Sequence, residues 1–286
     1  MTAQPDMTTL ATQLGCQRWG RRSCSWRPGV EVFDPSIYGV ELIERDATAR
    51  EFIAQHHYAR TMPPARLRVG LYRLNGAFGP ELVGVCVFSV PTSQRTIPMR
   101  LPGLEASQGV ELGRLVLLDS VPANGESWFV ARALKLLRAE LPGVLGVVSF
   151  ADPVPRRTSE GALVMPGHVG WVYQALEGHP LSRSTARTLW LDPRGCVLSP
   201  RTLQKIRAGE RGADGAMRHL LDLGAPKRAR HEDAGGWLRR VLREGPFRRL
   251  SHPGNLCYGW TWAPATRDAL GPVNHAAYTK RIEEEA

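Results

Sequence analysis

Three side chains suited to proton transfer stand at or near the predicted ends of regular elements. His57 follows a helix that must stop before Pro63-Pro64, and an imidazole with a pKa of about 6.5 can act as a base at neutral pH. Asp152 ends the apolar run Val147–Ala151, the end of a strand at which open α/β sheets often carry functional side chains. Tyr173 lies one turn into the next predicted helix. Together these residue types indicate acid–base chemistry.

Each of these residues also has a simple structural interpretation. His57 is then a structural histidine, Asp152 caps the turn that follows it, and Tyr173 is a core aromatic. His57 and Asp152, joined by Tyr58 or Tyr173, also supply the nitrogen and oxygen ligands that non-haem iron accepts. The sequence alone leaves acid–base catalysis, iron binding and a structural role open.

A second group of polar residues precedes an apolar helix predicted from Gly125 to Leu141. Asn124 and Ser127 flank the first helical residue, and Arg114 lies on the preceding strand. Unpaired N–H groups and the positive end of the helix dipole favour phosphate at such a position. The alternative is that Asn124 and Ser127 only cap the helix and that Arg114 pairs with a nearby glutamate.

These side chains need a scaffold in which strands and helices alternate. The apolar runs predict strands at 40–45, 67–74, 82–90, 110–118, 144–150, 185–191 and 256–262. Helices are expected at 46–57, 125–141, 167–177, 199–223 and 234–243. This order predicts an α/β fold with a mixed sheet flanked by helices. We expect a basic N-terminal extension, 1–37, and one catalytic domain, 38–286, with an Arg-rich helical insertion at 199–249.

Composition narrows the class of protein further. The chain has 286 residues, 43% of them hydrophobic, and no apolar run approaches the roughly 20 residues of a membrane span. Its five cysteines contain no C-x-x-C pair, which argues against a disulfide framework and a structural zinc site. The N-terminus lacks the apolar stretch of a secretory signal. A soluble, cytoplasmic protein is expected.

The net charge of +10 is concentrated towards the C-terminus, since residues 1–180 carry +2 and residues 181–286 carry +8. Most of the excess is arginine, whose planar guanidinium suits bidentate phosphate contacts. The sequence therefore favours a nucleic-acid partner over an acidic protein or a membrane surface. The residues predicted to contact the phosphates of the nucleic acid are Arg239, Arg240, Arg248 and Arg249.

Five motifs occur in an order that resembles a known family. They are His56-His57-Tyr58, Glu111-Leu112-Gly113-Arg114-Leu115, Asn124-Gly125-Glu126-Ser127, Ser149-Phe150-Ala151-Asp152 and Gly167-His168-Val169-Gly170-Trp171-Val172-Tyr173-Gln174-Ala175. The order of elements resembles the acyl-CoA-dependent N-acetyltransferase (GNAT) fold, and the motifs resemble the Mom family of phage DNA-modification proteins. The resemblance covers about residues 38–192 and departs from the family in Gly113, in a long loop after Asp152 and in the Arg-rich insertion.

The resemblance implies an enzyme that converts adenine in phage DNA to N6-(methylcarbamoyl)adenine and thereby shields the DNA from restriction endonucleases. It implies His57, Asp152 and Tyr173 as catalytic residues, with Arg114 and Ser127 holding acetyl-CoA or a related acyl-CoA. Asn124 and Gly125 complete the expected phosphate site, and iron remains a candidate cofactor. The implied partner is double-stranded DNA with a flipped adenine, for which Trp171 or Trp128 could supply stacking. A homodimer is a possible assembly, and the implied location is the cytoplasm of the bacterial host.

Two other functions fit parts of the sequence. One is a conventional acyl-CoA-dependent N-acyltransferase that acts on a small amine or a protein. The other is a DNA-binding protein without catalytic activity on an acetyltransferase scaffold. Acetyl transfer to such an acceptor with no effect on DNA would favour the first, and salt-sensitive DNA binding without turnover would favour the second.

Overall fold

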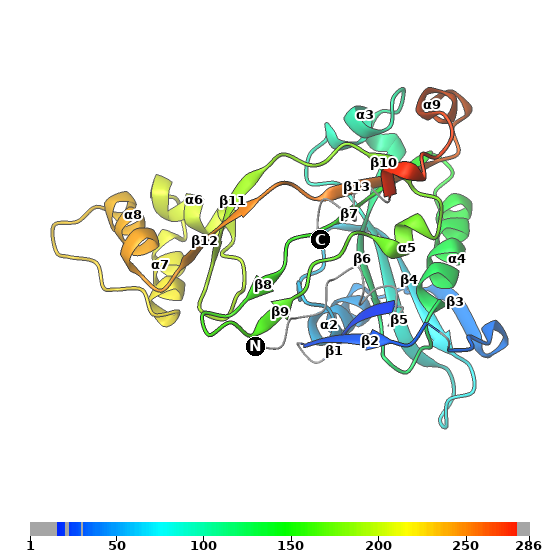
Figure 1. Ribbon diagram of the computed structural model, residues 1–286, viewed down its shortest axis with the longest axis horizontal. Coiled ribbons are helices and arrows are strands. Elements are labelled where there is room, and N and C mark those ends of the chain that lie inside the picture. Colours follow the sequence, from blue (N-terminus) through cyan, green and yellow to red (C-terminus); the bar gives the residue numbers. More distant parts are fainter. Residues whose placement is uncertain (1–15, 21–22, 30, 279–286) are drawn as a thin grey trace. The chain divides into compact units, whose positions relative to one another are not determined.

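The computed structural model describes residues 16–20, 23–29 and 31–278, which form two compact units (Figure 1). Unit 1 consists of Met1–Pro153, His168–Arg183 and Asn255–Ala286, and unit 2 of Val154–Gly167 and Ser184–Gly254. Of the predicted N-terminal extension, residues 1–15, 21–22 and 30 lie outside the described residues. No described helix is both long enough and apolar enough to cross a membrane.

Unit 1 is built on a seven-stranded mixed sheet with the order β10-β13-β7-β6-β5-β4-β3. The strands are β3 (Tyr38–Leu42), β4 (Ala65–Arg73), β5 (Glu81–Ser89), β6 (Gly109–Leu117), β7 (Gly146–Ala151), β10 (His179–Leu181) and β13 (Leu256–Thr261). Strands β6 and β7 pair in parallel, and the other neighbours in this sheet pair antiparallel. The structure confirms the predicted α/β fold class, a mixed sheet flanked by helices.

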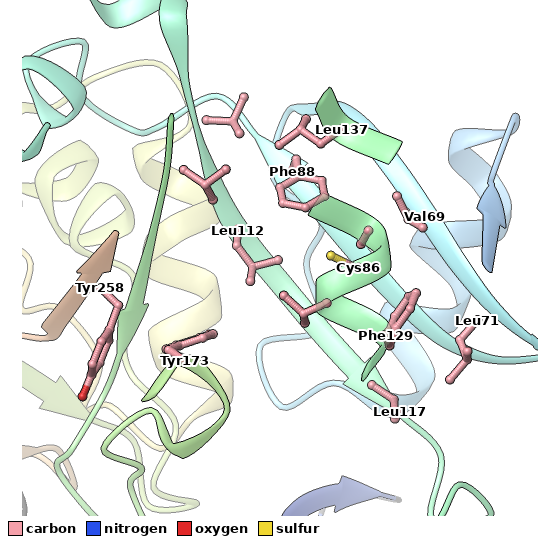
Figure 2. Packing of buried hydrophobic residues seen from close by; sticks show 14 of the residues in the cluster. Val69, Leu71, Cys86, Phe88, Leu112, Leu117, Phe129, Leu137, Tyr173 and Tyr258 are labelled. Carbon is pink, nitrogen blue, oxygen red and sulfur yellow. The ribbon is translucent and has the colours of Figure 1, made fainter. Parts of the chain in front are cut away.

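Two helices cover opposite faces of this sheet. Helix α4 (Gly125–Glu140) buries Phe129 and Leu137 against residues of β4, β5 and β6 (Figure 2). Helix α2 (Asp46–His56) buries Phe52 and Ile53 with alternate residues of β5, which therefore point to the other face. The shorter helices of unit 1 are η1 (Pro35–Ile37), α3 (Thr96–Arg100), η2 (Ala106–Gln108), α5 (Trp171–Gln174) and α9 (Pro264–Leu270).

The described part of the N-terminal extension begins with a hairpin. Strand β1 (Cys16–Gly20) pairs antiparallel with β2 (Ser23–Arg27).

Unit 2 has its own small core. Helices α6 (Pro200–Ala208), α7 (Ala213–Asp222) and α8 (Ala234–Glu244) pack around Ile206, Leu220 and Trp237. Two antiparallel strand pairs accompany them: β8 (Arg156–Arg157) with β9 (Leu163–Met165), and β11 (Arg187–Leu191) with β12 (Arg248–His252). The predicted insertion 199–249 therefore lies within unit 2, bracketed by β11 and β12.

Three local predictions need correction. The strand predicted at 185–191 is present as β11, but it pairs with β12 and does not join the main sheet, where the three-residue β10 pairs with β13. The helix predicted at 167–177 shrinks to Trp171–Gln174, because Gly170 adopts a left-handed φ of 84° that interrupts a right-handed helix. Asn124 occupies the N-cap position of α4, but with φ 71° its side chain makes no capping hydrogen bond.

Candidate active site

The centre of the sheet opens where β6 and β7 part. Their parallel pairing runs only from Gly109 to Glu111, after which β6 continues with β5 and β7 continues with β13. Beyond the last pair, the buried Ser149 hydroxyl donates to the carbonyl of Leu112 at 3.1 Å. The side chain thus bridges two strands that no longer share a backbone ladder.

A β-bulge at Gly113 lies beside this opening. Leu112 pairs with Phe88 and Arg114 with Val87, which leaves Gly113 as the extra residue. A Cβ at Gly113 would lie 2.5 Å from the hydroxyl oxygen of Ser89, so this position accepts no side chain without movement. Bulges of this kind redirect the side chains around them. Here the bulge directs Arg114 towards the end of α2.

His57 lies directly after α2 and is 8% exposed. Its Nδ1 accepts a hydrogen bond from the Ala59 amide at 3.0 Å, and its ring stacks on Tyr58 with centroids 4.3 Å apart. Burial, joined by the charges of Arg114 and His168, lowers the pKa of His57 to about 3. The imidazole is therefore neutral at pH 7, and because Nδ1 accepts, Nε2 carries the hydrogen. His57 in this state is a hydrogen-bond donor and a weak base.

Arg114 lies with His57 and not at the start of α4, where the predicted phosphate site would need it. Its Nε donates to the Thr61 carbonyl at 2.7 Å, and its Nη2 to the Thr61 hydroxyl at 3.3 Å. Burial lowers the pKa of the Arg114 guanidinium, while Tyr58 and Glu111 raise it. The arginine thus provides positive charge inside the opening.

Tyr173 reaches the same region from α5 and is 7% exposed. Its ring packs on Tyr258 and Trp260, with centroids 5.5 and 5.8 Å apart (Tyr173 and Tyr258 are labelled in Figure 2). Burial raises the pKa of Tyr173 above its usual range, although a hydrogen bond with the Ser149 side chain opposes the rise. Tyr173 is therefore a protonated phenol at neutral pH.

Glu111 is a further member of the cluster, although the sequence suggested for it only an ion pair with Arg114 and no functional role. Burial raises the pKa of its carboxyl group, and Arg114 opposes that rise. The Glu111 charge also acts on both Tyr173 and Arg114. An acidic residue in the middle of an apolar strand was the available signal.

Asp152 follows the last residue of β7 and is 8% exposed. Its carbonyl accepts a hydrogen bond from the His168 amide at 2.8 Å, and His168 in turn acts electrostatically on His57. The structure thus gathers His57, Arg114 and Tyr173 at the β6–β7 opening and places Asp152 beside His168. Among the residues that the structure describes, no group of three or more His, Cys, Asp or Glu is arranged to hold a metal ion.

The predicted phosphate cradle at the start of α4 is lined by carboxylates. The Ala123 amide donates to the Glu31 carboxylate at 3.0 Å, and Glu126 forms an ion pair with Arg18 whose side chains are 13% and 3% exposed. Ser127 donates to the Asn124 carbonyl at 3.2 Å, and Gly125 is buried. Glu31 takes the Ala123 amide and pairs with Arg27, and Glu126 pairs with Arg18, so the amide and both arginines are already engaged. This arrangement does not fit the phosphates of an acyl-CoA.

The four predicted DNA contacts differ in their surroundings within unit 2. Arg239 and Arg249 are exposed. Arg240 instead donates two hydrogen bonds to Glu232, each at 2.8 Å, and one to the Lys227 carbonyl. Arg248 is half-buried and donates to the Arg157 carbonyl. Two of the four guanidinium groups are thus held by internal contacts.

The candidate stacking residues also differ. Trp171 is 38% exposed. Trp128 is half-buried, with the Arg132 guanidinium 3.6 Å from its ring centroid and Phe33 packed edge-on at 5.3 Å. Trp171 is therefore the more accessible of the two rings.

Comparison with known proteins gives a family match and weaker structural likenesses. Residues 38–214 match the model of the Mom protein family. The chain is 33% identical over 132 residues to methylcarbamoylase mom of Escherichia phage Mu, a region that covers 44% of this chain and 46% of that protein. The matched region therefore spans less than half the length of this relative.

Two solved structures are similar at low identity. One is a tandem GNAT protein from the clavulanic acid biosynthesis pathway, with a TM-score of 0.37, 11% identity and coverage of 83% of this chain and 100% of that chain. The other is AtaTR bound with AcCoA, with a TM-score of 0.29, 18% identity and coverage of 51% and 87%.

Proposed function

The chain belongs to the Mom protein family, and on that premise we propose that it is a transferase that converts adenine in phage DNA to N6-(methylcarbamoyl)adenine. The modification would protect the DNA from host restriction endonucleases. One observation supports the proposal: the family match includes His57, Arg114, Asp152 and Tyr173, and of these Arg114 acts electrostatically on His57 while Tyr173 forms a hydrogen bond with Ser149 of β7.

The protonation states support distinct roles for these residues. Adenine N6 is an amine that must lose a proton when it gains a carbon substituent, and we assign Asp152, at the end of β7, as the acceptor of that proton. Neutral His57 and Tyr173 then act as hydrogen-bond donors that orient the adenine and its incoming group. Arg114 stabilises negative charge that develops between them.

Reaching these residues requires the adenine to leave the duplex, because N6 is paired inside it. Trp171, exposed two residues before Tyr173, offers a ring on which an extruded base can stack. We propose a member of the acyl-CoA class as the source of the two transferred carbons. The product is bonded to N6 through the methyl carbon and ends in an amide, so the transfer also requires an ammonia or amine donor, which displaces the CoA thiol at the carbonyl, and a two-electron oxidant that acts at the methyl carbon. The choice of an acyl-CoA follows from the family resemblance. The phosphates of that ligand would need a different arrangement of side chains at the start of α4.

Contact with the DNA backbone is assigned to unit 2 because of its charge. Residues 154–167 and 184–254 contain 17 Arg and Lys against 8 Asp and Glu, a net charge of +9 out of +10 for the whole chain. Of the four arginines predicted to contact phosphates, exposed Arg239 and Arg249 suit direct contacts, whereas Arg240 and Arg248 support the surface from inside. This charge favours a DNA substrate over a small amine.

Mass spectrometry of DNA from expressing bacteria tests the proposal. Nucleosides from cells with the unaltered protein are expected to contain methylcarbamoyl-deoxyadenosine, and the same DNA should resist restriction enzymes. Asp152→Asn and Tyr173→Phe should abolish the product, while the matched controls Asp222→Asn and Tyr72→Phe should retain it. DNA without modified adenine, together with acetyl transfer to small amines, would establish the conventional acyltransferase instead.

A further inference from the structure

A basic loop at residues 225–233 connects α7 to α8 and projects from the three helices of unit 2 (Figure 1). It exposes Lys227, Arg228 and Arg230 within four residues, and no carboxylate lies between them in the sequence. Among the residues that the structure describes, these three side chains form no ion pair or hydrogen bond, although Arg228 acts electrostatically on Glu232. The loop lies outside residues 38–214, so the family match does not account for it.

The backbone of the basic loop is held by two side chains of α8. The indole of Trp237, which is 1% exposed, donates to the Pro226 carbonyl at 2.8 Å. Arg240 donates to the Lys227 carbonyl at 3.0 Å. A backbone that is already fixed loses little conformational entropy when a partner binds, which favours binding. The loop therefore presents its cations from a preformed backbone.

Arg240 and Glu232 form an ion pair at the base of the loop. Arg240 donates two hydrogen bonds to Glu232, each at 2.8 Å, and Glu232 also accepts from the Ala229 amide at 3.2 Å. The hydrogen bonds with Arg240 lower the pKa of the Glu232 carboxyl group to about 2, so this group is ionised at pH 7. Arg240 thus neutralises a carboxylate that would otherwise offset the charge of Arg228.

The length of the charged segment fits one strand of duplex DNA. Three residues of chain span at most about 10 Å, which limits the distance between the backbones of Lys227 and Arg230. Phosphates of one strand follow each other at about 3.4 Å along the helix axis, so this length covers about three of them. Three cations without carboxylate partners therefore match about three neighbouring phosphates.

We propose that the basic loop contacts the phosphates of one strand of duplex DNA through Lys227, Arg228 and Arg230. Arg240 and Glu232 are positioning residues, which shape the loop and do not contact the DNA. The inference rests on the proposed function for the class of partner. It differs from the sequence prediction, in which Arg240 itself contacts phosphate.

Fluorescence anisotropy of the full-length protein with duplex DNA, at a series of salt concentrations, tests the loop. A triple variant carries Lys227→Gln, Arg228→Gln and Arg230→Gln. Its slope of log association constant against log salt concentration should be shallower by roughly 2.7, because each phosphate contact contributes roughly 0.9. At about 0.15 M salt, this difference corresponds to binding that is weaker by roughly 100-fold.

The matched control removes three cations of unit 2 that are paired with carboxylates: Arg194→Gln, Arg201→Gln and Arg243→Gln. This variant loses the same formal charge and should leave the slope nearly unchanged. Equal changes in both triple variants would overturn the loop, because the effect would then depend on total charge alone. Tighter binding of the unaltered protein to single-stranded DNA than to the duplex would overturn the assignment of duplex DNA.

The role of Arg240 is tested by restoring the charge balance at the base of the loop. Arg240→Gln should weaken duplex binding by roughly fourfold, the effect of one unit charge about 5 Å away in water, because Glu232 then offsets Arg228. Adding Glu232→Gln should restore most of the affinity. A double variant that binds no better than Arg240→Gln would overturn the positioning role.

The loop and the proposed reaction can fail separately. Duplex binding that is lost only in the loop variant, with no modified adenine in cells, would support the loop and refute the adenine modification. Unchanged duplex affinity in the loop variant, together with normal amounts of modified adenine, would overturn the loop and leave the proposed reaction intact.

Discussion

Removing the hydroxyl of Tyr258 should loosen the segment that carries Tyr173. Tyr258 is fully buried. Its hydroxyl donates to the Val169 carbonyl at 2.5 Å and accepts from the side-chain amide of Gln174 at 2.9 Å. These two bonds close the turn from which α5 projects Tyr173. Tyr258→Phe keeps the ring and leaves no cavity, so its effect isolates the hydrogen bonds.

The stability lost in Tyr258→Phe depends on the hydrogen bonds that remain after the substitution. The side-chain amide of Gln174 also donates to the Val169 carbonyl at 3.2 Å. Gln174 and Val169, the two partners of the Tyr258 hydroxyl, therefore keep a hydrogen bond with each other. We therefore expect a decrease of about 1–2 kcal/mol in the free energy of unfolding, the lower part of the range for a buried polar group that loses its partner. Tyr72→Phe, at a half-buried tyrosine of β4, is the control and should change stability by less than about 0.5 kcal/mol.

Urea unfolding measures the stability, and hydrogen exchange locates the effect. Amides of residues 169–174 should exchange faster in Tyr258→Phe, whereas those of β5 should not. A loss no larger than that of Tyr72→Phe would refute the assignment of Tyr258 as the support of this turn. Uniformly faster exchange over unit 1 would refute a local effect.

Three further predictions concern single positions. The pKa of His57 is about 3 in the folded state and about 6.5 in the unfolded chain, so the unfolded chain binds the proton first as the pH falls. The free energy of unfolding, measured by urea titration, should therefore fall by about 2 kcal/mol between pH 7.5 and pH 5. His57→Gln should lack this pH-dependent loss, and an unchanged pH dependence in that variant would contradict the assignment. Gly113→Ala should lower the free energy of unfolding by about 1–3 kcal/mol, because the new Cβ would lie 2.5 Å from the Ser89 hydroxyl oxygen. Adding Ser89→Ala in a double variant should restore most of that stability. Binding to duplex DNA, measured by fluorescence anisotropy, should weaken with salt along a line of log association constant against log salt concentration. Arg239→Gln and Arg249→Gln should each make the slope of that line shallower by roughly 0.9. Arg194→Gln, whose guanidinium pairs with Asp192, should leave that slope nearly unchanged, and equal effects from all three would contradict the assignment.

Long elements with a clear hydrophobic period were predictable from the sequence. The helix expected at 125–141 is α4 (Gly125–Glu140), and the strands expected at 82–90 and 110–118 are β5 and β6. Their periodicity is local, so composition and spacing suffice to predict them. The three-residue β10 was not predictable, because its place in the sheet comes from pairing with β13, about 80 residues away.

The candidate site was predictable only in part. Residue types and motif order indicated His57, Asp152 and Tyr173, since the first two stand at element ends and Tyr173 lies one turn into a predicted helix. The protonation states of His57 and Tyr173 depend on burial, which the sequence does not state. The position of Arg114 depends on the bulge at Gly113, which arises from the register of β5 against β6.

The sequence by itself determined the class of protein: its motifs indicated the family, its hydrophobic pattern the α/β fold, and its arginines the basic region. Only the tertiary structure decided how those parts are used. It assigned nearly all the net charge to unit 2, distinguished exposed Arg239 and Arg249 from the internally bonded Arg240 and Arg248, and placed Glu31 on the predicted phosphate site. The physical reason is distance along the chain. Periodicity and residue type act locally, whereas Glu31 meets Ala123, and Arg18 meets Glu126, only after the chain has folded.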